Sequence, residues 1–346
     1  MNKQNLLKSL FTLLLLLGSV DASAQEFYVN SIGYKISSNS ATVVNGKNAK
    51  GDVILPDYVT YNNKEYRVTS IGENAFESNK NLTSIILPDD VTGIEKNAFN
   101  GCKSLTSVIL PEGLKYIRIS AFSGCMNLTS INLPEGLTSI AVYAFQNCRS
   151  LTSVTLPESL ITLSTDAFRN CTSLTSITIP KNVTTIKEQV FYGCTGLTSI
   201  TISEGVKAIE ARAFSGCSSL TSITIPKSVT NMEIYAFDGC GANEIILNCN
   251  IPGGVSSTGL STFSGSSFNK YIINETVTEI GSYAFIGCKG EIIINSNQLS
   301  SYGLGGYTNK FSKITFGENV TSIPDRACLR CTNLTTVIIP ESVTTI

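Results

Sequence analysis

The chain has 346 residues, of which 42% are hydrophobic and 15% are charged, and its formal net charge is −1 at pH 7. This composition is too apolar for a disordered chain, and the chain is long enough to bury a large core. The absence of a long basic run excludes a surface that tracks nucleic-acid phosphates, and the absence of His excludes Ser-His-Asp and Cys-His catalytic arrangements.

Residues 1–24 have the organisation of a secretory signal peptide. Lys3 and Lys8 supply the positive start, Leu10–Leu17 is an apolar run too short to span a bilayer, and Ala22-Ser23-Ala24 fits the small-residue cleavage rule. No later stretch is long and apolar enough to form a transmembrane helix. We therefore expect a mature chain that begins at Gln25 after cleavage near Ala24, has no integral membrane segment, and is secreted or held at the cell surface.

The segment 25–70 is predicted to be a small N-terminal β cap. Three short runs are predicted strands: Glu26–Tyr34, Ala41–Asn45 and Asp52–Leu55. Val59–Tyr61 and Lys64–Val68 are predicted to form a hairpin around Asn62-Asn63, because Asn tolerates the positive φ that a two-residue turn needs. Such a cap would cover the apolar end of the repeat array that follows.

A repeat of 23 residues organises the chain from 71 to 240. Eight phenylalanines recur at this interval: Phe76, Phe99, Phe122, Phe145, Phe168, Phe191, Phe214 and Phe237. Seven leucines recur with them: Leu82, Leu105, Leu128, Leu151, Leu174, Leu197 and Leu220. A fixed period of this length is the signature of a solenoid, in which each repeat buries its apolar face only by stacking on its neighbours.

Within one repeat, Leu174, Ile177 and Ile179 occupy the first, fourth and sixth positions of a predicted strand. Alternation at period two puts the fourth and sixth side chains inward and the third and fifth outward. A proline usually follows, which suits a strand end because proline donates no N–H. A second apolar pair, such as Val183 and Ile186, predicts a short second strand. The Ala-Phe pair is predicted to lie on a short 3₁₀ or helical turn.

From 241 to 310 the repeat is irregular. Two stretches rich in Gly and Ser, Pro252–Ser267 and Asn295–Asn309, are predicted to be inserted loops. The whole array from 71 to 346 corresponds to about twelve coils. The sequence stops in mid-coil at Val343–Ile346 without a polar cap, which favours a fragment of a longer protein over an end that pairs with something else.

The segment Leu174–Cys194 carries most of the pattern Leu-x-x-Ile-x-Leu-Pro-x-x-Val-x-x-Ile-x-x-x-Ala-Phe-x-x-Cys, with Val190 in place of Ala. This pattern resembles the 23-residue leucine-rich repeat of the treponemal, or BspA-like, type, over roughly residues 71–346. The resemblance implies a right-handed, β-rich leucine-rich repeat solenoid with a parallel concave sheet. It also implies a bacterial surface or secreted protein, since some members of the family are adhesins for host matrix and plasma proteins or for other bacteria.

Cysteine also recurs every 23 residues, at Cys102, Cys125, Cys148, Cys171, Cys194, Cys217 and Cys240. Although export favours disulfides, stacked copies would point their side chains in parallel, which is the wrong geometry for a bridge. We expect buried free thiols. Cys328-Leu-Arg-Cys331 could be a redox pair or half of a zinc site, but Cys331 continues the ladder and Cys328 takes a Phe position, so two core substitutions explain it more simply. No catalytic residue, cofactor site or metal site is predicted.

The outward face of the strands is the candidate binding site, because the concave sheet is where ligands of leucine-rich repeats usually bind. Its third and fifth positions are Ser84, Ile86, Ser107, Ile109, Ser130, Asn132, Ser153, Thr155, Ser176, Thr178, Ser199, Thr201, Ser222 and Thr224. The face is uncharged and lacks the Tyr, Trp and Arg that dominate many interfaces. It could bind an extended chain or a sugar weakly, with avidity across coils, or it could be no more than a soluble β face.

Three functions remain open from the sequence. The first is an exported protein-binding module that adheres to a host or bacterial macromolecule. The second is a structural spacer that displays a missing C-terminal domain. The third is an array of Ser and Thr that binds carbohydrate or ice. No sequence feature identifies the ligand, the oligomeric state or the tether.

Overall fold

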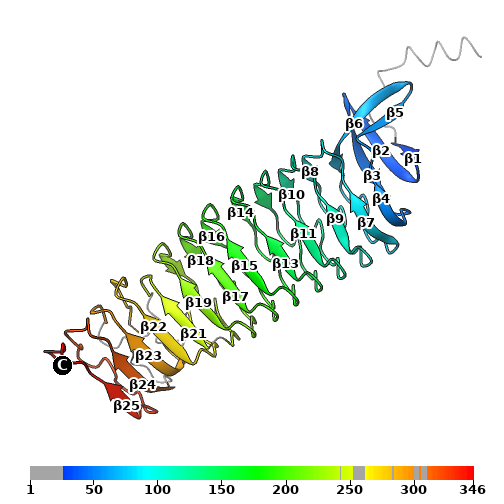
Figure 1. Ribbon diagram of the computed structural model, residues 1–346. Helices are drawn as coiled ribbons and strands as arrows, with labels where there is room; N and C mark the ends of the chain where they lie inside the picture. The colour runs from blue at the N-terminus through cyan, green and yellow to red at the C-terminus, as the bar shows by residue number, and fades with distance from the viewer. Residues whose placement is uncertain (1–25, 242, 252–261, 283, 300–303, 305–309) are drawn as a thin grey trace, which may run out of the picture.

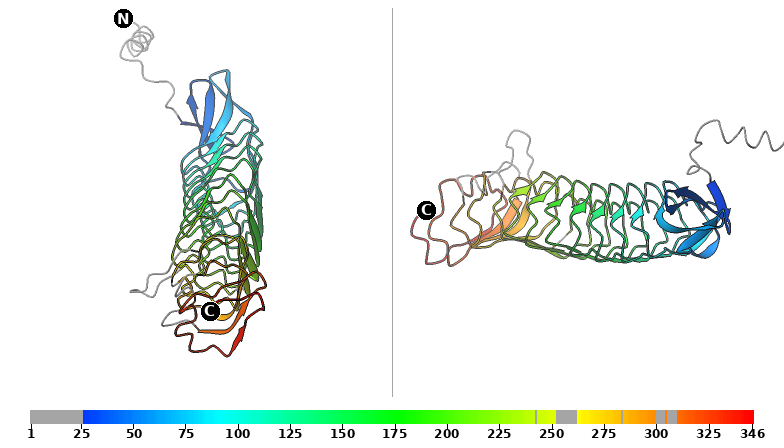
Figure 2. Two further views of the ribbon diagram at one scale, coloured as in Figure 1. Left: turned by 90° about the vertical axis from the view of Figure 1, so that its left-hand side faces the viewer. Right: turned by 90° about the horizontal axis from the view of Figure 1, so that it is seen from above.

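The computed structural model describes residues 26–241, 243–251, 262–282, 284–299, 304 and 310–346. The chain is an elongated β solenoid whose coils stack along one axis, with the β cap at the N-terminal end (Figure 1). Two further views show the same rod (Figure 2). The predicted solenoid of stacked parallel strands is confirmed. Residues 1–24 and much of the two predicted loops, at 252–261, 300–303 and 305–309, lie outside the described residues.

The long strands of successive coils form one column that runs the length of the rod. They are β4 (Gly51–Ile54), β7 (Leu82–Ile86), β9 (Ser107–Ile109), β11 (Ser130–Asn132), β13 (Ser153–Thr155), β15 (Ser176–Ile179), β17 (Ser199–Ile202), β19 (Ser222–Ile225), β21 (Glu244–Leu247), β22 (Lys270–Ile273), β23 (Lys289–Ile294), β24 (Lys310–Phe316) and β25 (Thr336–Ile338). Equivalent positions pair in parallel, as Ser176 does with Ser199 and Ile177 with Ile200. The repeat length therefore sets the register directly.

The second apolar pair of each repeat forms a second column, as predicted. Its strands are β6 (Lys64–Ile71), β8 (Gly93–Ile94), β10 (Tyr116–Ile117), β12 (Ser139–Ile140), β14 (Thr162–Leu163), β16 (Thr185–Ile186), β18 (Ala208–Ile209) and β20 (Asn231–Met232). Most of them are two residues long and pair in parallel with their neighbours. Strands this short are stable only because they stack on their neighbours along the column.

The N-terminal segment contains β1 (Glu26–Val29), β2 (Ile32–Ser37), β3 (Ser40–Asn45) and β5 (Tyr58–Tyr61). The prediction of a single strand over Glu26–Tyr34 is wrong, because Asn30 and Ser31 adopt positive φ and turn β1 back onto β2 as an antiparallel hairpin. The hairpin predicted around Asn62-Asn63 is present, with φ of 50° and 60° at the two residues. β4 pairs in parallel with β7, so the long-strand column begins within this segment.

The Ala-Phe segments are successive turns and not the predicted 3₁₀ or helical turns; the described residues contain no helix. The amide of Ala98 bonds to the carbonyl of Glu95, but the amide of Phe99 bonds to Ala121 of the next coil at 2.8 Å. Asn97 adopts a φ of 56°, which a helix does not allow. Every second amide thus joins two coils, and this alternation replaces the local ladder that a helix requires.

The core is a stack of phenylalanine rings. From Phe76 to Phe237 neighbouring ring centroids lie 5.0–5.8 Å apart, and the ring planes differ by 3–11°. The stack continues through Phe263 and Phe285, although the spacing in the sequence is uneven there. Full burial of a Phe side chain contributes about 1.5–3 kcal/mol of transfer free energy, so the stack is a main source of stability.

The seven cysteines of the regular repeat line this core as free, buried thiols. Each Sγ donates a hydrogen bond to the backbone carbonyl of the Phe of the preceding coil, over 3.0–3.4 Å. Burial raises the pKa of Cys148 and of Cys194 to about 12. The thiols therefore have a defined place in the backbone hydrogen-bond network, beyond filling space.

Candidate binding face

The outward side of the long-strand column, called the sheet face below, carries all fourteen residues predicted from the repeat. Ser84 and Ile86 are half-buried and the other twelve are exposed. The third positions stack in register, as Ser130 does with Ser153, and so do the fifth positions, as Asn132 does with Thr155. The two rows follow from the parallel register, because residues one repeat apart become neighbours on adjacent strands.

A further row, missed by the sequence reasoning, consists of the threonines at the second position of the repeat. The hydroxyl of Thr106 donates to the carbonyl of Thr83 at 2.9 Å, and that of Thr152 donates to the carbonyl of Thr129 at 3.1 Å. The same bond recurs from Thr129 to Thr221, over 3.0–3.3 Å. These hydroxyls are used within the solenoid and hold their side chains in one orientation.

The serines of the third row differ from these threonines. Within the described residues, the hydroxyls from Ser107 to Ser222 in that row have no protein hydrogen-bond partner, and these side chains are exposed. An exposed hydroxyl that bonds only to water can exchange that water for a ligand at little cost. The Ser row is therefore a polar part of the sheet face whose hydroxyls the solenoid itself does not use.

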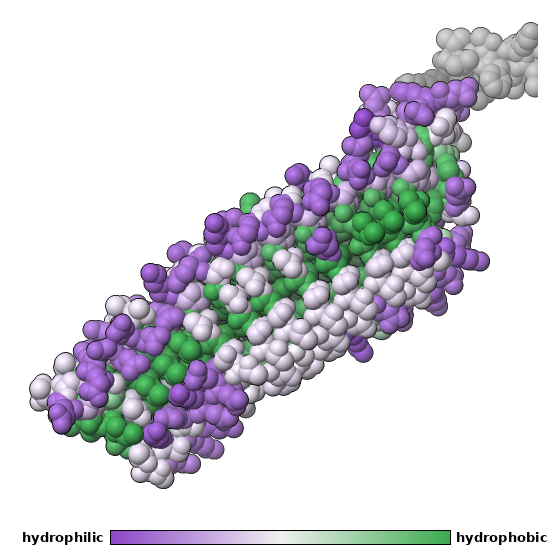
Figure 3. All heavy atoms as spheres, in the orientation of Figure 1, coloured by the Kyte–Doolittle hydropathy of each residue, from purple (hydrophilic) through white to green (hydrophobic). Residues whose placement is uncertain are grey.

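The N-terminal end of the sheet face is apolar. Ile54 lies in register with Ile86, and Ile86 with Ile109. Ile54 is 74% exposed and Ile109 is 57% exposed, and the hydropathy view shows a green patch at this end (Figure 3). Ile54 lies in the predicted strand Asp52–Leu55 of the cap segment 25–70, so the sequence does not assign it to the face. Residues 52–56, Asp-Val-Ile-Leu-Pro, match residues 84–88, Ser-Ile-Ile-Leu-Pro, of the first regular repeat. This match is the sequence signal that could have placed Ile54 on the face.

A hollow of about 630 Å³ adjoins this patch. It is lined by residues 29–32 and Tyr34, from β1 and β2 and the turn between them, and by residues 48–50 and 52–56, along β4. Asp52 lines it too and accepts hydrogen bonds from Ser84 at 2.6 Å and Thr83 at 2.8 Å, which lower the pKa of its carboxyl below the ordinary value. The patch therefore combines apolar side chains, a concavity and a fixed acceptor.

The C-terminal end of the sheet face changes character. The third row continues from Ser222 to Glu244, Lys270, Glu291 and Lys313, and the fifth row continues as Ile246, Ile272 and Ile293. In Figure 3 the pale band of the middle of the face gives way here to purple beside green. The predicted rows end at Ser222 and Thr224, because they cover only the regular repeats.

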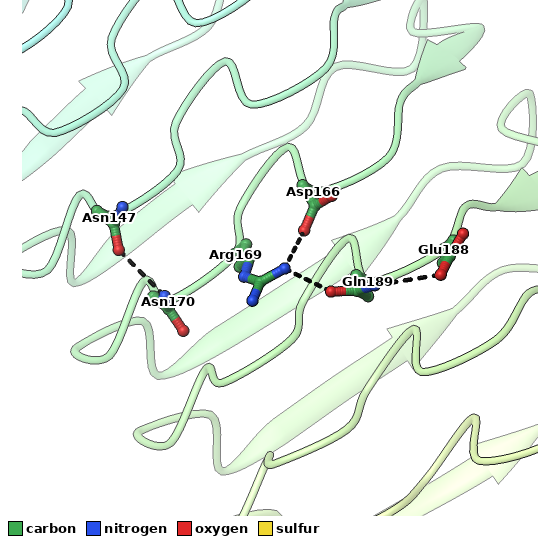
Figure 4. Close-up of polar contacts among 6 residues, drawn as sticks. All are labelled: Asn147, Asp166, Arg169, Asn170, Glu188 and Gln189. Carbon is green, nitrogen blue, oxygen red and sulfur yellow. Dashed lines mark hydrogen bonds and ion pairs between the residues drawn. The ribbon is translucent and has the colours of Figure 1, made fainter.

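A different polar surface lies on the turns that carry the phenylalanines (Figure 4). Arg169 donates to Asp166 at 3.1 Å and also to Gln189 of the next coil, while Asn170 donates to Asn147 of the preceding coil at 3.1 Å. Arg169 also lies over the ring of Tyr192, 4.6 Å from its centroid. Arg and Tyr are common in interfaces, but here they link adjacent coils.

The surroundings of Cys328 and Cys331 affect how readily their thiols ionise. Cys328 and Cys331 are half-buried, and burial, with Cys328 as a smaller cause, raises the pKa of Cys331 to about 11. A redox pair requires a lowered thiol pKa. In the part of the chain that the structure describes, no three His, Cys, Asp or Glu side chains are grouped so as to hold a metal ion. No helix among those residues is long and apolar enough to cross a membrane.

Comparison with known proteins identifies the repeat. The family model described as 'BspA type Leucine rich repeat region (6 copies)' matches four overlapping stretches, residues 69–196, 115–244, 184–268 and 242–346. A leucine-rich repeat protein from Bacteroides ovatus is similar, with 28% identity and a TM-score of 0.63, over 92% of this chain and 78% of that one. The T. pallidum leucine-rich repeat protein is similar too, with 28% identity and a TM-score of 0.51, over 57% of this chain and 91% of that one. None of the curated protein sequences matches the chain. The chain belongs to the BspA-type leucine-rich repeat family.

Proposed function

We propose that the protein is an exported bacterial binding module that holds an extracellular protein on its sheet face. The observation that carries the proposal is the pair of outward rows that stay in register along the column and end in an apolar row, in which Ile54 and Ile109 are exposed and Ile86 between them is half-buried. A contiguous apolar patch rimmed by polar residues is typical of an interaction site. Leucine-rich repeat proteins, the family to which the chain belongs, are typically protein-binding.

The apolar end supplies most of the affinity in this proposal. Each of the three isoleucines would contribute up to about 1.5–3 kcal/mol if a ligand buried it fully. The hollow beside Ile54 can take a protruding side chain of the ligand. Asp52 can accept a hydrogen bond from a ligand donor next to the apolar contact, since an ionised carboxylate has more lone pairs than the two hydroxyl donors use.

The uncharged Ser and Thr rows in the middle of the sheet face extend the proposed contact with the ligand over several coils. Serine and threonine lose little side-chain entropy on binding, and their regular spacing lets an extended segment contact several coils at once. A host matrix or plasma protein, or a protein of another bacterial surface, is the proposed partner. A glycan is the alternative ligand, because the same row of hydroxyls can bond to sugar hydroxyls.

Export to the medium or to the cell surface is part of the proposal. It rests on the basic start, the apolar run and the Ala22-Ser23-Ala24 site of the leader. The two similar structures of this repeat type come from bacteria. A leucine-rich repeat outside the cytoplasm meets proteins and glycans of the surroundings, which are the partner classes named above.

The test is direct binding of purified residues 25–346 to immobilised extracellular-matrix proteins, plasma proteins and polysaccharides. Saturable binding to a protein is the expected result. Saturable binding only to polysaccharide would replace the protein ligand with a glycan. A blank across the panel would overturn the binding proposal and leave the role of a structural spacer.

A matched pair of variants assigns the site. Ile109→Asp adds a charge to the sheet face at an exposed position and is expected to weaken binding at least about tenfold, equivalent to about 1.4 kcal/mol. Ile161→Asp is the control, since Ile161 is 62% exposed and precedes the second-column strand β14. Alanine substitutions at Ser153, Thr155, Ser176 and Thr178 should weaken binding less than Ile109→Asp does. Equal loss for both Asp variants would place the ligand elsewhere.

A further inference from the structure

The third row of the sheet face ends in an alternating charge ladder. Glu244, Lys270, Glu291 and Lys313 lie on the successive strands β21 to β24 and are paired in register. Lys270 forms an ion pair with Glu244 at 3.2 Å, and Lys313 forms one with Glu291 at 2.8 Å. The four side chains are 28–40% exposed, so each can still contact a second molecule.

An apolar row runs beside the ladder. Ile246, Ile272 and Ile293 lie in register at the fifth position, followed by Thr315. All four are half-buried. A partner that lies over the ladder therefore also covers a strip of isoleucine, which adds apolar burial to the charge contacts.

The ladder is complementary to its own reverse. From β21 to β24 the charges are negative, positive, negative, positive. In the reverse order, from β24 to β21, every position carries the opposite sign. A two-fold axis parallel to the strands, between β22 and β23, reverses the strand order in the second copy and keeps each row opposite itself. Glu244 then faces Lys313 of the second copy, Lys270 faces Glu291, and Ile272 faces Ile293. No like charges face one another.

We propose that this end of the sheet face binds the same end of a second copy of the chain. The ladder has no net charge, so a uniformly acidic or basic partner would meet one unfavourable contact for each favourable one. The favoured partner carries alternating charges at the spacing of adjacent strands, about 4.8 Å. A second copy meets this condition, and a contact that uses the same patch on both copies closes as a dimer.

The size of the contact indicates a weak dimer. The six long strands β19 and β21 to β25 would cover roughly 400 Å² on each copy at the spacings of a β sheet, about half of a standard interface. The flanking contacts are compatible, since Ser222 would face Thr336 of the second copy. We therefore expect association at tens of micromolar or above, which salt weakens because part of it is electrostatic.

Two double variants test the proposal, with residues 25–346 in sedimentation velocity from 1 to 500 µM. The variants are E244K/K270E and E291K/K313E. In both of them residues 244 and 270 still carry opposite charges, residues 291 and 313 do too, and the net charge is unchanged. In a dimer of either variant, however, like charges would face one another at all four positions. Each variant alone is expected to stay monomeric where the parent chain dimerises.

An equimolar mixture of the two variants supplies the decisive result. Every facing pair in the mixed dimer has opposite charges, so the mixture is expected to regain the dimer of the parent chain. Restored association cannot come from misfolded variants. The proposal is overturned if the parent chain is monomeric up to 500 µM, if either variant dimerises alone as the parent does, or if the mixture stays monomeric.

Discussion

The thiol of Cys148 donates a hydrogen bond to the backbone carbonyl of Phe122, one coil back and 3.2 Å away. The carbonyl of Phe122 also accepts the amide of Cys125, at 3.2 Å. Both acceptor positions of this oxygen are therefore used, one within the coil and one between coils. Repetition of the pair down the core explains why the recurring cysteines form no bridges, because each thiol is already engaged with the backbone.

Stability is expected to fall steeply at alkaline pH. The pKa of Cys148 is raised to about 12 by burial, whereas a thiol in an unfolded chain titrates near 8.5. Above pH 8.5 the unfolded state releases protons that the folded state retains, so the free energy of unfolding decreases by about 1.4 kcal/mol per pH unit for each such thiol. Urea unfolding followed by circular dichroism at pH 7 to 10 measures this slope.

Cys148→Ala provides the control for this titration. The variant should be less stable at pH 7, because it loses the thiol and leaves a small cavity. Its slope above pH 9 should be shallower than that of the parent chain by about 1.4 kcal/mol per pH unit. Parallel curves for the two proteins would contradict the assignment of the slope to the buried thiols.

Replacement of Tyr143 is expected to stabilise the protein. Tyr143 adopts a φ of 59°, and the equivalent residue two repeats earlier is Asn97, with a φ of 56°. Asn tolerates this conformation much better than a bulky aromatic residue does. Tyr143→Asn should therefore raise the free energy of unfolding by about 1 kcal/mol in thermal or urea unfolding. The opposite change, Asn97→Tyr, should lower it by a similar amount, and stabilisation by both would refute the argument.

Two adjacent residues on the sheet face should separate stability from binding. Thr152→Val removes a hydroxyl that donates to Thr129 at 3.1 Å, and should cost about 0.5–1 kcal/mol of stability. Ser153→Ala removes a hydroxyl without a described protein partner, and should change stability by less than about 0.5 kcal/mol. A ligand bound along the face should be weakened more by Ser153→Ala. The reverse pattern would mean that the threonine row contacts the ligand.

The stacked rings should dominate the response of the core to substitution. Phe168 is fully buried, with ring centroids 5.2 Å from Phe145 and 5.8 Å from Phe191. Phe168→Ala should cost about 3–5 kcal/mol through lost burial and the cavity left behind. Phe168→Leu should cost less because it refills part of the volume. Similar losses for the two variants, measured by urea unfolding, would show that the stacking geometry outweighs the volume.

The sequence by itself determined the solenoid, its register and the fourteen residues on the sheet face. It could do so because a constant repeat length makes neighbours in space out of equivalent positions in the sequence. Only the tertiary structure decided that Asn30 and Ser31 turn β1 back onto β2, and that the Ala-Phe segments are not helical. Those outcomes depend on amides that bond to a neighbouring strand or coil, which no single repeat reveals.

The two ends of the sheet face also depended on the tertiary structure. Ile54 and Glu244 take their places there because β4 and β21 pair with β7 and β19, while the spacing of their sequences departs from 23 residues. Strand pairing tolerates loops of unequal length, because the hydrogen-bond ladder fixes the register wherever the intervening chain runs. A periodic sequence therefore determines the middle of a solenoid, and packing between strands determines its ends.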